Sequence, residues 1–139
     1  MERKDGFYTQ TAYTDGGVMS AAMEDYLEMI CRTAKRGGAV RVRDLAASLH
    51  VRPSSVTHMV RGLVAAGYVT AERYGYITPT EEGRVAGDYL LWRHDVLHRF
   101  LCALHGTADE LESAEKIEHY LDRRTVERLA LLTKKMTGE

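Results

Sequence analysis

The sequence predicts a mainly α-helical protein that begins with a winged helix-turn-helix and continues as a second helical domain. Two short amphipathic stretches separated by a turn lie directly before a run rich in β-forming residues, "YVTAERYGYIT" (68–78). A long apolar helical pattern follows this run, and two shorter ones come after it. Helix, turn, helix and hairpin in this order are typical of a winged helix.

The first helix is predicted from Ser20, which can cap it, to about residue 35, where Gly37-Gly38 ends it. Its apolar stripe consists of Met23, Tyr26, Leu27 and Ile30. The preceding residues, 1–19, are polar and lack a long periodicity. We therefore expect a flexible arm there.

The helix-turn-helix is predicted over residues 42–66. A short helix covers about 42–49, a turn covers 50–52, and a second helix starts at Pro53, because proline is favoured at the first helical position. Gly67 ends this helix, and Tyr74-Gly75 marks the tip of the wing. Six apolar side chains of the two helices are expected to face each other: Leu45, Leu49, Val51, Val56, Val60 and Leu63.

The long helix is predicted to start with a capping box in which Thr78 is the N-cap, Pro79 the first position and Glu81 the third. It runs to about His105, before Gly106, and is apolar on two sides, so it must be packed on several sides. Two further helices are expected over about 108–121 and 124–136. The predicted division is an arm (1–19), a winged helix-turn-helix domain (20–78) and a helical domain (79–139).

Composition indicates a soluble globular protein of 139 residues, with 45% hydrophobic and 28% charged residues. No 18-residue apolar run predicts a membrane span, and the N-terminus lacks the apolar core of a secretory signal, so we expect a cytoplasmic protein without a membrane partner. The net charge is −1, yet residues 35–84 carry eight basic and four acidic side chains, a local net charge of +4. A local positive patch is what phosphate binding requires.

This basic middle predicts binding of double-stranded DNA by the second helix of the motif, which would enter the major groove. Near the start of such a helix, serine and threonine reach phosphates or base edges, and arginines contact phosphates or the minor groove. The alternative is an ordinary solvated helix face. The expected DNA-binding residues are Arg41, Arg43, Arg52, Pro53, Ser54, Ser55, Thr57, His58, Arg61 and Arg73.

Carboxylates and histidines on three predicted helices form a candidate metal site. Taken singly, the acids suit a solvated face and the histidine of the long helix suits a hydrogen-bonded core position. Taken together, inward-facing carboxylates and imidazoles can build a metal centre in a helical bundle, and an oxygen-rich set without thiolate favours Mn²⁺ or Fe²⁺ over a structural Zn²⁺. The set consists of Asp25, Glu28, His94, Glu115, Glu118 and His119.

Four segments resemble the diphtheria toxin repressor family, and most of all its manganese transport regulator branch: "MEDYLEMI" (23–30), "VRPSSVTHMVRGL" (51–63), "RHDVLHRFL" (93–101) and "EKIEHYL" (115–121). The resemblance covers about residues 20–136 and implies that all six residues above are metal ligands. The iron-responsive branch has methionine at position 25 and cysteine at position 115, so the acids found here favour Mn²⁺. The resemblance further implies two metals per subunit with bridging carboxylates, and a homodimer that binds a palindromic operator when metal-loaded.

The predicted function is a manganese-responsive repressor of metal-uptake genes, with Mn²⁺ as co-repressor and no enzymatic activity. One alternative is an Fe²⁺-responsive regulator of the same family, and other divalent transition metals could also bind. A second is a metal-independent winged-helix regulator that senses a small aromatic ligand or oxidation at Cys31 or Cys102, which otherwise read as two buried thiols. A third is a hydrolase or oxidase with a dinuclear carboxylate centre.

Overall fold

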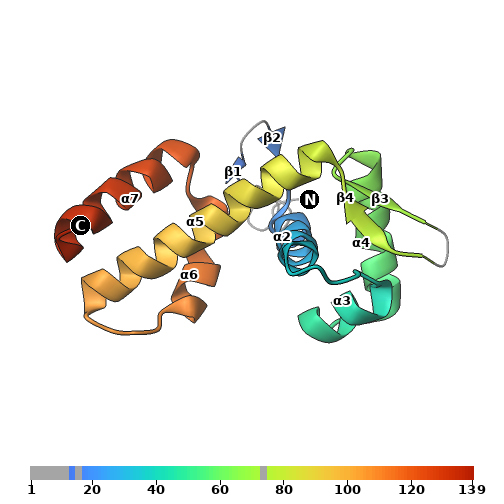
Figure 1. Cartoon of the computed structure of the whole chain (residues 1–139), viewed down its shortest axis with the longest axis horizontal. Coiled ribbons are helices and arrows are strands. Elements are labelled where there is room, and N and C mark those ends of the chain that lie inside the picture. The colour runs from blue at the N-terminus through green and yellow to red at the C-terminus, as the bar shows by residue number, and fades with distance from the viewer. Residues whose placement is uncertain (1–12, 15–16, 73–74) are drawn as a thin grey trace, which may run out of the picture. The chain divides into compact units, whose positions relative to one another are not determined.

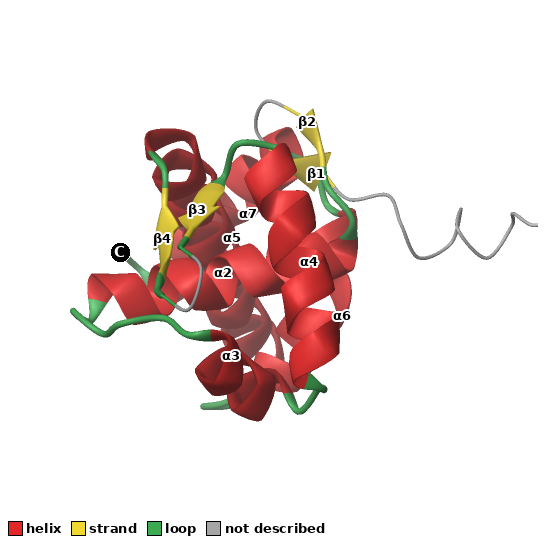
Figure 2. Ribbon diagram, turned by 90° about the vertical axis from the view of Figure 1, so that its right-hand side faces the viewer, coloured by secondary structure: helices red, strands yellow, loops and turns green. Residues whose placement is uncertain are grey.

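The computed structural model describes residues 13–14, 17–72 and 75–139. It divides into two compact units, one from Ala22 to Asp88 and one made of Tyr89–Glu139 with the chain before Ala22. Figure 1 traces the elements along the chain, and Figure 2 shows that most of them are helices. The predicted mainly α-helical fold is confirmed.

The Ala22–Asp88 unit holds three helices, α2 (Ala21–Lys35), α3 (Val42–Leu49) and α4 (Pro53–Ala65), at the predicted positions. Apolar side chains at helical spacing form its core, because one stripe of each helix must leave water. The buried set from these helices is Tyr26, Leu27, Ile30, Cys31, Leu45, Ala46, Val56, Val60 and Leu63. Val51, which we expected in this core, is instead 38% exposed.

Two left-handed residues end the first two helices of this unit. Gly37 follows α2 with a φ of 79°, a conformation that glycine adopts without steric cost. His50 follows α3 with a φ of 57°, and its N–H points at the carbonyl oxygens of Ala46 and Ala47. This tight turn brings the chain round to Pro53 at the first turn of α4.

The wing is a two-stranded antiparallel sheet of β3 (Val69–Ala71) and β4 (Ile77–Pro79), which run side by side in Figure 2. Val69 pairs with Pro79 and Ala71 with Ile77. The N–H of Ile77 also donates a hydrogen bond of 2.8 Å to the carbonyl of Val40, just before α3. The wing is therefore tied to the start of the helix-turn-helix.

The start of α5 (Glu81–His105) differs from the expected capping box. Thr80 is the residue before the helix, and its hydroxyl accepts the N–H of Gly83 at 3.0 Å while donating to the carbonyl of Gly67 at 2.6 Å. The predicted cap Thr78 and Pro79 lie in β4. Pairing with β3 keeps residues 77–79 extended, so the helix can begin only after them.

The Tyr89–Glu139 unit contains the rest of α5, then α6 (Leu111–Ile117), the short 3₁₀ helix η1 (Glu118–Tyr120) and α7 (Arg123–Thr137). Its core packs Leu97 and Leu101 of α5 against Ala114 of α6, with Phe100, Leu121 and Leu129 beside them. The single helix expected over about 108–121 is thus wrong in its bounds. The α-helix ends at Ile117, and a tighter turn carries the next three residues.

Most of the predicted arm lies outside the described residues. Its described part includes the strands β1 (Tyr13–Thr14) and β2 (Gly17–Val18), which pair antiparallel. Within the described ranges, no helix is both long and apolar enough to cross a membrane.

Gly83 is expected to be essential for the junction between wing and α5. A Cβ built there would collide with the backbone carbonyl of Tyr68, which cannot move aside as a flexible side chain could. We expect Gly83→Ala to lower the free energy of unfolding by about 2 kcal/mol, measured by urea denaturation. Gly62→Ala is the matched control, because a Cβ on that α4 glycine meets nothing within 4 Å and should stabilise by about 0.5–1 kcal/mol. Equal effects of the two substitutions would contradict this account.

Candidate functional site

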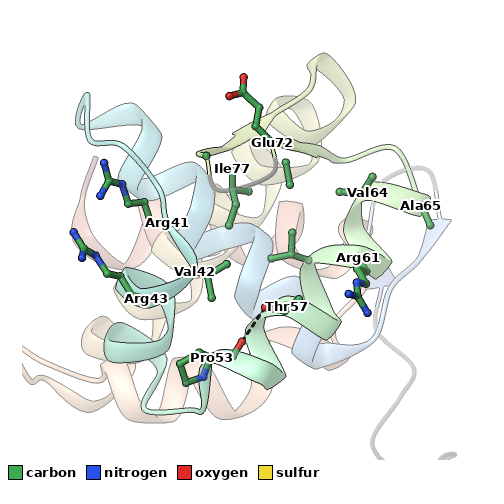
Figure 3. A pocket seen from close by; sticks show the side chains of 13 residues that line it. Arg41, Val42, Arg43, Pro53, Thr57, Arg61, Val64, Ala65, Glu72 and Ile77 are labelled. Carbon is green, nitrogen blue, oxygen red and sulfur yellow. Dashed lines mark hydrogen bonds between the residues drawn. The ribbon is translucent and has the colours of Figure 1, made fainter.

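A basic hollow of about 990 Å³ lies between the start of α3, the outer face of α4 and the wing. Arg41 and Arg43 lie on one side of it and Arg61 on the other, as Figure 3 shows. Pro53 and Thr57 of α4 also line it, so the structure brings five of the predicted DNA-binding residues around one depression. Apolar side chains line most of the hollow, and the three arginines at its margins supply positive charge for an anionic ligand such as a phosphate backbone.

The remaining predicted contacts lie outside the lining of this hollow. Arg52, Ser54, Ser55 and His58 are exposed on and just before α4, where a duplex could reach them. Arg73, the predicted wing contact, falls outside the described residues. Thr57 is half-buried, and its hydroxyl donates to the carbonyl of Pro53 at 3.1 Å, so that hydroxyl is already engaged within the helix (Figure 3).

Tyr76 of the wing was missed by sequence reasoning. Its hydroxyl accepts a hydrogen bond of 2.7 Å from Arg41, whose guanidinium also lies 4.8 Å from the tyrosine ring centre. This hydrogen bond raises the pKa of Arg41 above its ordinary value, which is by itself high enough to keep the guanidinium charged. The signal available in the sequence was that Tyr76 is an aromatic residue next to Gly75 at the tip of the predicted wing. Glu72 also lines the hollow and places one negative charge at its rim.

The α2 half of the candidate metal set presents two carboxylates one turn apart. Asp25 is exposed, whereas Glu28 is only 8% exposed. The Oε2 atom of Glu28 accepts a hydrogen bond of 2.7 Å from Arg32, one turn further along α2. This ion pair orients the Glu28 carboxylate, as expected for charges at i and i+4.

The other half of the set is built around a contact between α5 and η1. Nδ1 of His94 lies 2.8 Å from Oε1 of Glu118, and Nε2 of the neighbouring His119 lies 3.7 Å from Oε2 of the same carboxylate. Glu118 is 2% exposed and His119 7% exposed. A carboxylate this deeply buried requires compensating positive charge or hydrogen bonds. Two imidazoles flank it, and a cation bound by the same atoms would compensate it more fully.

Glu115 behaves differently from the two residues that follow it in the motif. It lies on α6 and is exposed, whereas Glu118 and His119 lie on η1 and are buried. The single helix predicted over about 108–121 would place all three on one α-helix, and this is wrong because α6 ends between them at Ile117.

Comparison with known proteins decides the family. The family model described as "Iron dependent repressor, N-terminal DNA binding domain" matches residues 18–77, and "Iron dependent repressor, metal binding and dimerisation domain" matches residues 80–138. The chain belongs to the iron-dependent repressor family. This confirms the resemblance to the diphtheria toxin repressor family. The chain is a DNA-binding transcriptional regulator whose second half corresponds to a metal-binding and dimerisation domain.

Two curated relatives of this chain share one name. A protein of Geobacillus kaustophilus, "HTH-type transcriptional regulator MntR", is 39% identical over 110 residues, which is 78% of this chain and 77% of the relative. Its namesake from Lysinibacillus sphaericus is 37% identical over 116 residues, covering 83% and 84%. Both relatives are matched over most of their length.

A solved structure described as "Manganese-dependent transcriptional repressor complex with manganese" is 28% identical, with a TM-score of 0.71. The match covers 80% of this chain but 52% of the other, so this chain spans about half the length of that repressor. The shared part is the fold described above.

Two buried charges next to predicted ligands were also missed by sequence reasoning. Glu24, beside Asp25, and Arg93, beside His94, are both fully buried. Neither breaks the helical pattern as a proline or glycine would, so only burial reveals them. A buried charge requires compensating charges or hydrogen bonds, so each of these residues adds an electrostatic constraint next to a candidate ligand.

Cys31 is expected to react far more slowly than Cys102. Burial, and secondarily the charge of Asp88, raises the pKa of the Cys31 thiol to about 11, so the nucleophilic thiolate is scarce at pH 8. We expect Cys102→Ser protein, which retains Cys31, to react with Ellman's reagent at least about tenfold more slowly than Cys31→Ser protein. In denaturant the two should react alike. Equally fast labelling of the native proteins would restore thiol oxidation at Cys31 as a sensing mechanism.

Proposed function

We propose that this iron-dependent repressor family member is a manganese-activated repressor that binds a palindromic operator as a homodimer. The observation that carries the proposal is the buried contact between His94 and Glu118, which joins an imidazole nitrogen and a carboxylate oxygen at 2.8 Å. Two donor atoms this close can share one cation.

The proposed ligand set contains four carboxylates and two imidazoles from α2, α5, α6 and η1. The donor chemistry of each half supports it: oriented acids on α2, and a buried mixed pair on α5 and η1. When bound, the metal supplies positive charge that offsets repulsion among the acids. We propose two metals per subunit, because four carboxylates provide enough oxygens to bridge a pair. The set consists of Asp25, Glu28, His94, Glu115, Glu118 and His119.

Manganese is the proposed metal because the set is hard and contains no sulfur ligand. Carboxylate oxygens suit Mn²⁺, and imidazole is tolerated by most first-row metals. The names of the relatives and of the solved manganese complex support the same choice. Later metals such as Co²⁺ and Zn²⁺ can still bind in vitro, since the Irving–Williams order favours them.

For the DNA-binding half, we propose that α4 enters the major groove while the basic hollow receives the phosphate backbone. In a symmetric dimer, two such helices would meet successive major grooves about 34 Å apart on one face of the duplex. Metal binding would favour the DNA-competent conformation, so DNA must in return raise metal affinity by the same factor.

Glu118→Gln tests the metal half with almost no change in side-chain volume. The amide cannot supply the same anionic ligand, so metal-dependent operator binding should be lost, as measured by a mobility-shift titration against Mn²⁺ with chelator as reference. Glu112→Gln is the control, because Glu112 is an exposed α6 residue paired only loosely with Lys116 at 3.4 Å. Unchanged manganese dependence in Glu118→Gln would refute the site. Repeating the wild-type titration with Fe²⁺, Co²⁺ and Zn²⁺ tests the choice of metal.

Arg61→Gln tests the DNA half. Loss of one phosphate contact should weaken binding to operator and random DNA by similar factors and reduce the slope of log affinity against log salt by about one. Arg128→Gln on α7 changes the same charge at an exposed residue that is not part of the lining of the hollow, and should leave the slope unchanged. A loss confined to the operator would instead assign Arg61 to base recognition.

A further inference from the structure

The segment that carries the buried ligands Glu118 and His119 is not part of a continuous α-helix. It passes through η1 and then becomes extended, with φ and ψ of −102° and 135° at Leu121 and −79° and 165° at Asp122. An α-helix would fix the orientation of its side chains through its own hydrogen bonds. Only the start of this segment is held by helix hydrogen bonding, where the Glu118 N–H donates to the Ala114 carbonyl, so contacts with α5 must orient the rest.

The upstream end is anchored in the apolar core. Ala114 of α6 packs against Leu97 and Leu101 of α5, and Leu121 joins the same cluster. These contacts hold the segment on the side of α5 that follows His94 in sequence. Because Leu121 follows His119 by two residues and Leu129 lies in α7, the same core also holds the downstream side of the segment.

A cation–π contact anchors that downstream end. The guanidinium of Arg123, the first residue of α7, lies 4.1 Å from the ring centre of Tyr89 on α5. Tyr89 is 5% exposed, so the pair is largely removed from water, where such contacts are strongest. The Arg93 guanidinium lies 5.7 Å from the same ring.

These contacts form an antiparallel series along α5. Ala114 contacts Leu97 and Leu101, Glu118 contacts His94, and Arg123 contacts Tyr89. Later residues of this segment thus contact earlier residues of α5. The candidate ligands therefore lie between two contacts with the apolar core, at Ala114 and Leu121, and the cation–π contact follows the second of these by two residues. Arg123 follows His119 by four residues, and Tyr89 precedes His94 by five, so a shift at this anchor is transmitted over a short stretch of chain.

We propose that the Tyr89–Arg123 pair is a positioning clamp that sets the geometry of the His94, Glu118 and His119 half of the metal site. The clamp rests on the proposed metal-binding function and adds residues that do not themselves ligate. Removing it leaves every ligand present but lets the ligand segment move relative to α5. The consequence is weaker metal binding by a folded protein, as for other groups that orient metal ligands.

The test is Mn²⁺ affinity, followed by electron paramagnetic resonance of free Mn²⁺ in titrations of the folded full chain. Arg123→Met removes the cation while keeping a long apolar side chain, and should weaken affinity by about tenfold. Arg124→Met makes the same change at the exposed neighbouring position and should leave affinity unchanged. Circular dichroism at the titration temperature verifies that both variants are folded.

The tyrosine side of the clamp gives an independent check. Tyr89→Phe keeps the ring and should bind Mn²⁺ like the wild type, whereas Tyr89→Leu should resemble Arg123→Met. The double variant Tyr89→Leu/Arg123→Met should lose clearly less affinity than the sum of the two single losses, because both substitutions remove the Tyr89–Arg123 contact. Wild-type affinity in Arg123→Met, or additive losses in the double variant, would overturn the clamp. Failure of the wild-type chain to bind Mn²⁺ would overturn the proposed function itself.

Discussion

The contact between His94 and the buried Glu118 carboxylate is the constraint on which the Tyr89–Glu139 unit depends. A carboxylate that is almost fully removed from water is costly unless positive charge or donors face it. Its position is fixed by where α6 ends and where α7 begins, and both points are held against α5. The apolar core of this unit therefore has a second role besides stability, because it sets the distance between a nitrogen and an oxygen donor.

The helix-turn-helix depends on a different constraint, the close packing of backbone at its edges. Thr80 connects the end of α4, the wing and the start of α5 through two hydrogen bonds of one hydroxyl. Gly83 and Gly87 then let α5 approach the Tyr68 carbonyl and the Cys31 side chain more closely than any Cβ would allow. Small residues here allow close contact between elements, whereas the arginines around the hollow are the residues proposed to contact DNA.

The helices of the Ala22–Asp88 unit could be located from the sequence, because apolar periodicity marks their extent and glycine and proline mark their ends. The prediction of helix bounds failed where the local sequence allowed two alternatives and a contact between residues distant in the chain selected one of them. Thr78 and Thr80 are both acceptable caps, and only strand pairing with β3 excludes the first. No glycine or proline marks the end of α6 at Ile117, and the partnership of Tyr89 with Arg123 joins residues far apart in the chain. The ligand types were visible in the sequence, whereas their different burial was not.

The end of α6 at Ile117 separates the six candidate ligands into parts that can change independently. Glu115 lies on the exposed face of a regular helix, while the next two ligands lie on η1, which is held at both ends. A substitution at position 115 alters one donor without disturbing the buried pair. This is the position at which the iron-responsive branch is distinguished by a cysteine. At the proposed site, a change of metal preference would therefore need only a change at an exposed position, while packing keeps the buried donors in place.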